Sequence, residues 1–396
     1  MTQDKSEQPT RSLDRAMGAV PLAYSGPGGA VAVLKDGEVM IRHAWGWADV
    51  DRRIPFTPQT LFRICSITKQ FTVALMLERF ADPAELDADI RARLPLLDGA
   101  VPSALDLANN QSGLRDYWAT AMLCGSPAEA PFDEARARHL VGLTRSLQFT
   151  PGTRFSYCNQ NFRLLSDVVA AHAGVSYGDL LRRQVFDPAC MPTARLCADT
   201  ATMPDGTVGY EGTLEAGFRA AVNRIHWTGD AGIGASLDDM IAWERHIDAA
   251  RDDPASVTSR LAVPQHFRDG GAAAYGLGLN QMKLLGRHAT GHGGGLRGWR
   301  SFRCYLPAER ISIVVLFNHM ADARAAALDL LATLVDAPAK PPALRVAESM
   351  APSWGGSWQE PETGLVVRVV AAPDDQVRLH FGQGVETLDA VGPGET

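Results

Sequence analysis

The sequence predicts an α+β fold in which one antiparallel sheet, built from both ends of the chain, is covered by helices. An Asp-Gly turn at 36–37 separates the apolar runs 30–34 and 39–45, which is a hairpin signal. Helical patterns dominate from about 82 to 250, and strand patterns return after 270. The helical middle is therefore expected to form a lobe inserted between two parts of the sheet.

The remaining elements follow from the same patterns. Residues 1–12 are expected to be disordered, and a short helix over about 13–20 should end at Pro21. Residues 13–336 are expected to form one large domain. Its clearest helices and strands are expected at 133–146, 162–173, 177–185, 237–250 and 321–335 (helices), and at 275–283, 300–306 and 311–317 (strands).

The C-terminal part has a different composition. Residues 337–343 contain three prolines among alanines and are expected to be a linker. Residues 344–396 contain strand patterns at 364–370 and 376–381. A closed barrel usually needs about eight strands. We therefore expect an incomplete antiparallel β domain, the start of a truncated β-barrel-like unit.

Composition excludes several classes of function. The 396 residues carry a net charge of −7 without a basic stripe, which argues against nucleic-acid binding. No apolar run is long enough to span a membrane, and the polar N-terminus has no signal sequence, so a cytoplasmic location is expected. The six cysteines form no Cys-x-x-Cys pair, and no clustered ligand set indicates a metal; no cofactor is expected. Homodimerisation is left open.

The pair Ser66 and Lys69 carries the first chemical signal. Apolar residues around it have helical spacing, so the two side chains should lie one turn apart on the same side of a buried helix. A hydroxyl and an amine at that separation can share a proton, as an activated serine nucleophile requires. Taken alone, a Ser-x-x-Lys match is more often a helix cap followed by a solvated lysine.

Two later segments could supply the base and the oxyanion donors that this pair lacks. Tyr157 and Asn159 follow a Pro-Gly turn and precede a helix; a tyrosine facing an amine can act as a base, although packing and capping explain such residues equally well. His292 begins the run His-Gly-Gly-Gly, where strand N–H groups could bind an oxyanion. A glycine-rich bend with a structural histidine is the ordinary alternative.

In this order along the chain, Ser66-Ile67-Thr68-Lys69, Tyr157-Cys158-Asn159 and His292-Gly293-Gly294 resemble the serine penicillin-recognising enzymes, the S12 or class C β-lactamase-like family. The resemblance covers about residues 20–335. Longer phrases, including 109–118, 229–233 and 290–299, look closest to the D-stereospecific aminopeptidase branch. The resemblance implies a β-lactamase/transpeptidase-like fold and a serine hydrolase acting on the N-terminal residue of D-amino-acid amides or small peptides.

The resemblance also implies roles for individual residues. Ser66 would be acylated, with Lys69 and Tyr157 exchanging its proton. Asn159, His292 and, as a weaker transfer, Asn280 would bind or orient the substrate. The backbone N–H groups of Ser66 and Gly295 would form the oxyanion hole.

One departure from the family pattern concerns substrate choice. Many relatives have Lys-Thr-Gly at the place of His292-Gly293-Gly294, and their lysine helps to bind a substrate carboxylate. Neutral imidazole supplies less positive charge near pH 7. This disfavours carboxypeptidase or efficient β-lactamase activity and favours substrates recognised by an N-terminal amine, an amide or an ester. The resemblance also implies two C-terminal β-barrels, with a loop from the last one reaching the active site to bind the α-amino group of the substrate. Because the β domain is expected to be incomplete here, we expect impaired or broadened aminopeptidase specificity.

Other readings stay open. An α/β-hydrolase is disfavoured because the sequence contains no Gly-x-Ser-x-Gly elbow. A dinucleotide-binding enzyme is disfavoured because the match Gly293-x-Gly295-x-x-Gly298 is followed by a strand pattern rather than a helix. A carboxylesterase of the same family, or a noncatalytic binding or scaffold protein derived from it, keeps the fold and is the serious alternative.

Overall fold

The computed structural model describes residues 7–127, 129–335, 355–359, 366–371, 376–381 and 384–389. The chain divides into two compact units. The larger unit comprises residues 1–116 and 131–337, and the smaller comprises 117–130 and 338–396. The expected linker at 337–343 lies outside the described residues.

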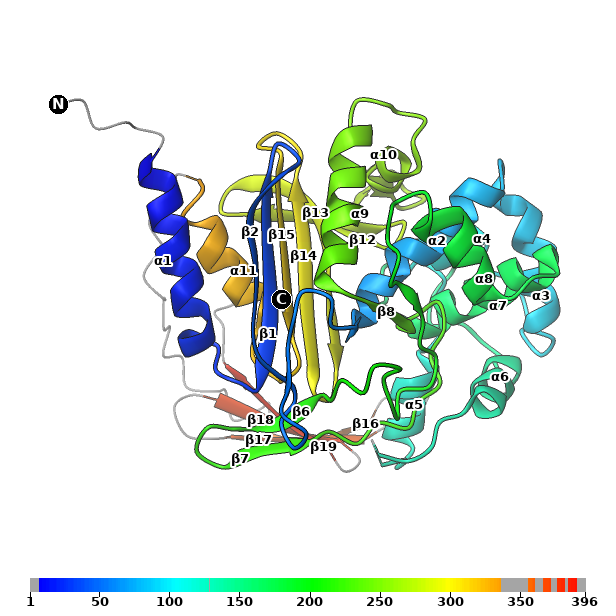
Figure 1. Ribbon diagram of the computed structural model, residues 1–396. Helices are drawn as coiled ribbons and strands as arrows, with labels where there is room; N and C mark the ends of the chain where they lie inside the picture. Colours follow the sequence, from blue (N-terminus) through cyan, green and yellow to red (C-terminus); the bar gives the residue numbers. More distant parts are fainter. Residues whose placement is uncertain are drawn as a thin grey trace. The chain divides into compact units, whose positions relative to one another are not determined.

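An eight-stranded antiparallel sheet forms the centre of the larger unit, in the order β11-β12-β13-β14-β15-β1-β2-β3 (Figure 1). β1 (Gly28–Lys35) pairs with both β2 and β15, so strands from the two ends of the unit meet at the middle of the sheet, as the sequence predicts. The other strands are β2 (Glu38–Asp49), β3 (Ile54–Pro55), β11 (Tyr275–Gly276), β12 (Leu279–Leu284), β13 (Arg287–Leu296), β14 (Trp299–Leu306) and β15 (Ile311–Phe317).

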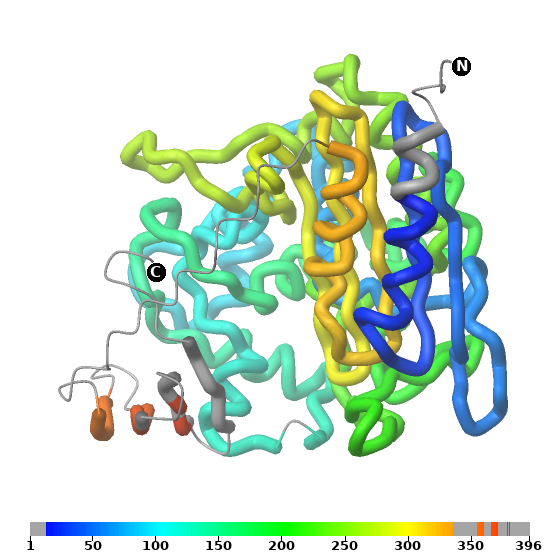
Figure 2. Tube along the Cα trace, turned by 90° about the vertical axis from the view of Figure 1, so that its left-hand side faces the viewer, coloured from blue at the N-terminus to red at the C-terminus, as the bar shows by residue number. Residues whose placement is uncertain are grey.

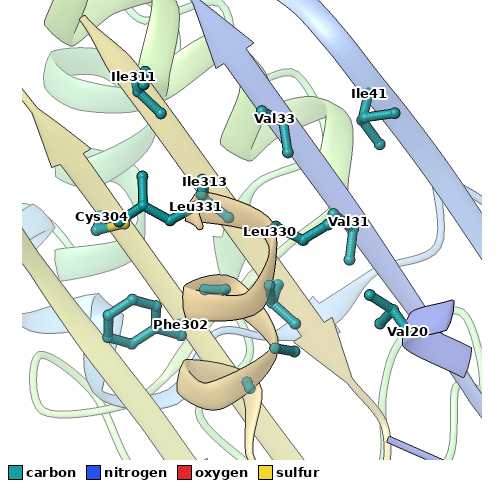
Figure 3. Packing of buried hydrophobic residues seen from close by; sticks show 14 of the residues in the cluster. Val20, Val31, Val33, Ile41, Phe302, Cys304, Ile311, Ile313, Leu330 and Leu331 are labelled. Carbon is teal, nitrogen blue, oxygen red and sulfur yellow. The ribbon is translucent and has the colours of Figure 1, made fainter. Parts of the chain in front are cut away.

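Two helices, α1 (Glu7–Ala23) and α11 (Ala323–Leu331), lie side by side over one face of this sheet (Figure 2). Leu13, Met17 and Val20 of α1 are buried at helical spacing. Alternate residues of the strands, such as Val31 and Phe302, point into the same core because successive side chains of a strand face opposite sides (Figure 3).

The opposite face carries α2 (Thr68–Arg79) and α9 (Leu237–Ala250) (Figure 1). α9 is joined to the sheet by a buried ion pair, in which Arg303 Nε and Nη2 donate to the two Glu244 carboxylate oxygens at 2.6 and 2.7 Å. Ser312 Oγ donates to the same carboxylate at 2.8 Å. A buried charge is tolerated only when it is paired and hydrogen-bonded, so these contacts fix where α9 docks.

The expected helical lobe is present between β4 and β11. Its helical segments are η1 (Cys65–Ile67), η2 (Pro83–Leu86), α3 (Asp87–Arg93), α4 (Ala104–Ala108), α6 (Glu134–Gly142), α7 (Asn159–Ala173), α8 (Tyr177–Leu181), η3 (Arg182–Phe186) and α10 (Val257–Leu261). Short strands accompany them: β4 (Phe62–Arg63), β5 (Arg195–Leu196), β6 (Tyr210–Thr213), β7 (Gly217–Ala220), β8 (Ile233–Ala235), β9 (Gln265–His266) and β10 (Ala272–Ala273).

Two expected elements differ from the structure. α1 begins at Glu7, inside the segment expected to be disordered, and it contains Pro21 in its last turn. Burial of its apolar stripe against the sheet outweighs the loss of one backbone donor at the end of the helix. The single strand expected over 275–283 is two strands, because Leu277 and Gly278 have φ values of +52° and +77° and turn the chain back on itself.

The smaller unit contains α5 (Tyr117–Leu123) and a four-stranded antiparallel sheet. Its strands are β16 (Gly356–Gln359), β17 (Val366–Ala371), β18 (Gln376–Phe381) and β19 (Gly384–Asp389). β17 and β18 fall on the two strand patterns expected in this region. Across the described residues, no helix has the length and apolarity needed to cross a membrane.

Candidate active site

Ser66 lies in η1, the 3₁₀ turn that runs directly into α2. Ile64, Ile67 and Phe71 around it are fully buried, so the packing of α2 fixes the turn while Ser66 itself stays partly exposed. Thr68 Oγ1 accepts a hydrogen bond from the Ile233 N–H at 3.1 Å and ties the turn to β8. The predicted nucleophile is therefore held on a rigid element and remains accessible.

Lys69 is fully buried, and its amine makes three hydrogen bonds. Nζ donates to Ser66 Oγ at 3.1 Å, to Asn159 Oδ1 at 2.8 Å and to the backbone oxygen of Asp230 at 2.7 Å. The solvated lysine of the ordinary alternative is thus wrong. A buried amine with three fixed acceptors, one of them the nucleophile, can pass a proton to or from Ser66 with little rearrangement.

Tyr157 and Asn159 lie at the start of α7, and both are next to Lys69, as predicted. The ring of Tyr157 lies 4.8 Å from Lys69 Nζ, and the side chain is 39% exposed. Among the described residues no hydrogen bond links the Tyr157 hydroxyl to Ser66 or Lys69, so the ring face rather than the hydroxyl meets the amine here. Catalytic hydrogen bonds are often completed only when substrate is bound.

His292 lies in β13, so the glycine-rich run is part of a strand and not a bend. Its Nδ1 is 2.5 Å from the Gly293 backbone oxygen, and its Nε2 is 3.2 Å from the Tyr275 hydroxyl. This assigns the proton to Nδ1 and makes Nε2 the acceptor from Tyr275. Burial, reinforced by the positive charge of Lys69, lowers the pKa of His292 from 6.5 to about 3.

Close contact between β13 and η1 places the two predicted oxyanion donors on adjoining backbones. A Cβ on Gly294 would lie 2.2 Å from Ser301 Oγ and 2.4 Å from the Ile64 backbone oxygen, so only glycine permits this approach. Ser301 Oγ donates to the same Ile64 oxygen at 2.9 Å. The N–H groups of Ser66 and Gly295 belong to the segments held together in this way.

Asn280 has a different environment from the other predicted residues. It pairs with Gly291 across β12 and β13, and its Nδ2 donates to the Gly291 oxygen at 3.4 Å. Because paired residues share a face of the sheet, Asn280 points to the face opposite His292. The structure therefore places Asn280 at the edge of β13, apart from the group around Lys69.

The site also depends on residues that sequence reasoning missed. Asp116 Oδ2 accepts the Asn159 N–H at 2.5 Å, and Asn110 Oδ1 accepts the Cys158 N–H at 3.1 Å and the Asn161 amide at 3.0 Å. The segment around Asn110 is rich in asparagine and glutamine. Its density of uncharged polar residues after a buried helix was the available signal of a buried polar network.

Together these contacts join a serine hydroxyl, a lysine amine, a tyrosine ring and an asparagine amide from two distant segments. Within the part of the chain that is described, no group of three or more His, Cys, Asp or Glu side chains is placed to hold a metal ion. The fold and this constellation define the class of protein as a serine hydrolase of the acyl-transfer type.

Comparison with known proteins identifies the family. The Beta-lactamase family profile matches residues 11–337, and the chain belongs to that family. It is 55% identical to the D-aminopeptidase of Gluconobacter oxydans (strain 621H) over 96% of this chain and 71% of that protein. It is 47% identical to the D-aminopeptidase of Brucella canis over 97% of this chain and 73% of that protein.

Solved structures show the same fold at lower identity. The octameric penicillin-binding protein homologue from Pyrococcus abyssi aligns with a TM-score of 0.68 at 24% identity, covering 95% of this chain and 89% of that one. D-amino acid amidase from Ochrobactrum anthropi SV3, complexed with D-phenylalanine, aligns with a TM-score of 0.65 at 21% identity, covering 81% of this chain and 98% of that one. Both confirm the expected α+β, β-lactamase-like architecture.

Proposed function

We propose that the protein is a D-stereospecific aminopeptidase-like serine hydrolase, which releases the N-terminal residue of D-amino-acid amides or short peptides through an acyl-enzyme. The observation that carries the proposal is the hydrogen-bonded set of Ser66 Oγ, Lys69 Nζ and Asn159 Oδ1. Identity of 47–55% to two D-aminopeptidases over nearly the whole chain supports the substrate class.

The proposed reaction has two steps. Ser66 Oγ attacks the carbonyl carbon while its proton moves to Lys69 Nζ and one proton of that ammonium moves on to Tyr157, which acts as the base in the phenolate form that the neighbouring ammonium favours. The oxyanion is stabilised by the N–H groups of Ser66 and Gly295. The C–N bond then breaks, and the leaving amine takes up that proton. In the second step water adds to the ester carbon and loses a proton to the same base, and Ser66 is released with its proton restored.

Asn159 has a positioning role in this scheme. It accepts from Lys69, and its own N–H is fixed by Asp116, so the amine has one orientation toward Ser66. His292 contributes a neutral wall of the pocket rather than a charge, because both ring nitrogens are already used by Gly293 and Tyr275. Assembly as a homodimer stays a prediction, to be checked by light scattering.

Turnover of paired stereoisomers tests the proposal. We expect kcat/KM for D-alanine p-nitroanilide to exceed that for the L-isomer by at least about tenfold, since the mirror substrate cannot place both its amine and its scissile carbonyl in the same site. Ser66→Ala should abolish the activity. An intact preference for the D-isomer would reject the impaired or broadened specificity expected from the sequence, whereas equal use of both isomers would contradict the stereospecific assignment. Hydrolysis of p-nitrophenyl esters without any amide turnover would favour a carboxylesterase of the same family.

A further inference from the structure

Tyr275 is a buried aromatic residue that contacts two groups of the active site. It lies in β11 and is only 3% exposed. Its hydroxyl is 3.2 Å from His292 Nε2, and its ring centroid is 5.6 Å from that of the imidazole. The same centroid is 6.2 Å from that of the Tyr157 ring, and the two ring planes are at 82°. Tyr275 therefore connects His292 to the residue proposed as the base.

The backbone on both sides of Tyr157 is fixed by Asn110. The Ser156 N–H donates to the Asn110 backbone oxygen at 2.9 Å, and the Cys158 N–H donates to Asn110 Oδ1 at 3.1 Å. These bonds determine where the Cα of Tyr157 lies, but its side chain still has several staggered rotamers to choose from. Contacts with the ring itself must therefore keep it beside Lys69.

The ring of Tyr157 has an open side and a buried side. The residue is 39% exposed, and within the described part of the chain its hydroxyl has no hydrogen-bond partner in the protein. On the buried side the ring lies 4.8 Å from Lys69 Nζ, and its centroid is 6.1 Å from that of His292. Tyr275 adds a nearly perpendicular ring pair, an arrangement in which aromatic side chains attract each other. The orientation of Tyr157 thus depends on these buried groups.

Tyr275 is suited to hold this ring because its own position is fixed from two directions. Its hydroxyl donates to His292 Nε2 on β13. Two residues along the chain, the Leu277 N–H donates to Asn109 Oδ1 at 2.9 Å and fixes the turn that ends β11. Asn109 directly precedes Asn110, which fixes the backbone of the other tyrosine. Both rings are therefore carried by the same short segment of the helical lobe.

We propose that Tyr275 is a positioning residue of the reaction: its ring keeps the Tyr157 ring beside Lys69, where Tyr157 acts as the base. The inference rests on the proposed function and adds a residue to the same site. His292 takes part through the same contact, because its Nε2 anchors the Tyr275 hydroxyl. This gives a role to an imidazole whose two nitrogens are both engaged within the protein.

Three variants separate positioning from a purely structural role. Tyr275→Leu removes the ring, and Tyr275→Phe removes only the hydroxyl. Phe317→Leu is the matched control, because Phe317 is a fully buried ring of the same sheet whose aromatic neighbours, Tyr24, Trp45 and His319, are not part of the site. Tyr275→Met replaces Tyr275→Leu if the latter does not fold, since an unbranched side chain adapts to irregular space.

Labelling of Ser66 by a fluorophosphonate measures the activation of the nucleophile without a peptide substrate. We expect Tyr275→Leu to slow labelling about 10- to 100-fold, because a misplaced base loses most of its contribution. The kcat for D-alanine p-nitroanilide should fall by a similar factor, with KM changed less than about threefold, since the change affects the reaction more than binding. Tyr275→Phe should recover most of the loss. Phe317→Leu should lower the unfolding temperature but leave the labelling rate unchanged.

Fluorine NMR of protein that carries 3-fluorotyrosine separates this inference from the proposed reaction. The Tyr157 resonance, assigned by its loss in Tyr157→Phe, should move and broaden in Tyr275→Leu but not in Phe317→Leu, whether or not the D-substrate is turned over. If the wild-type protein is neither labelled nor active, this resonance alone decides. An unchanged resonance in Tyr275→Leu contradicts the proposal.

The labelling rates give further outcomes that overturn it. Wild-type labelling in Tyr275→Leu would show that Tyr157 needs no support from this ring. An equal loss in Tyr275→Phe and Tyr275→Leu would assign the effect to the hydroxyl instead of the ring. A loss in Phe317→Leu as large as in Tyr275→Leu would show that any weakening of the sheet slows the reaction.

Discussion

At the residue scale, His292 and Lys69 illustrate how burial sets the chemistry of the pocket. Both side chains are almost fully buried, yet Lys69 finds three oxygen acceptors while His292 pairs as a neutral ring with Tyr275 and Gly293. Burial and the charge of Lys69 together keep the pKa of His292 near 3. Protonating this ring would place a second positive charge beside the amine.

This pKa predicts an acid-dependent loss of stability. In the unfolded chain His292 takes up a proton near pH 6.5, but in the folded protein it does so only near pH 3. Between these values the unfolded state binds more protons, so the free energy of unfolding falls as pH falls, by up to about 1.4 kcal/mol per pH unit. The contribution is complete above about pH 6.5. His319, with a pKa lowered to about 4 by burial, adds a similar effect.

Urea unfolding at pH 7, 6, 5 and 4 measures the slope of the free energy of unfolding against pH. His292→Asn should make it shallower by up to one proton, and His43→Asn is the control for replacing a histidine at an exposed position. The same slope in wild type and His292→Asn would contradict the neutral buried ring.

At the element scale, the contact of β13 with η1 sets the geometry of the oxyanion region. Gly294→Ala would force its Cβ onto Ser301 Oγ and the Ile64 oxygen, and overpacking of this kind costs about 1–3 kcal/mol. We expect a corresponding fall in the free energy of unfolding, together with a loss of D-aminoacyl hydrolysis as η1 shifts.

Gly293→Ala is the matched control for folding, because its Cβ would meet nothing nearer than 3.8 Å. Chemical denaturation of the two variants gives the comparison. If Gly293→Ala destabilised the protein as much as Gly294→Ala, the close approach of the backbones would not be the reason for glycine at 294.

Some elements could be predicted from local pattern and others could not. α9 matches its expected range because its apolar period is clear and Ser236 and Asp239 form a capping box. The break between β11 and β12 was missed because Leu277 adopts a positive φ that a local pattern does not predict. A Cβ built on Gly278 would lie 2.8 Å from the Lys69 carbonyl, so a contact with a distant part of the chain determines this turn.

At the scale of the whole larger unit, the chemistry depends on three segments that the fold brings together. The sequence indicated Ser66, Lys69 and Tyr157 because their residue types and order are specific to one kind of reaction. It did not indicate Asp116 or Asn110, whose roles come from partners far along the chain. Many polar residue types can accept a hydrogen bond from a distant backbone N–H, so residue type does not reveal such a role. A nucleophile and its base require specific residue types, so the sequence can indicate them.

The central claim is that Ser66 is activated by the groups gathered around it. The most direct measurement is labelling of the folded protein with a fluorophosphonate probe, followed by peptide mapping. The account predicts a single adduct on Ser66, lost in Ser66→Ala and formed about 10²–10⁴ times more slowly in Lys69→Met and Tyr157→Phe. A folded protein that is not labelled, or one labelled at the same rate without Lys69 and Tyr157, would contradict it.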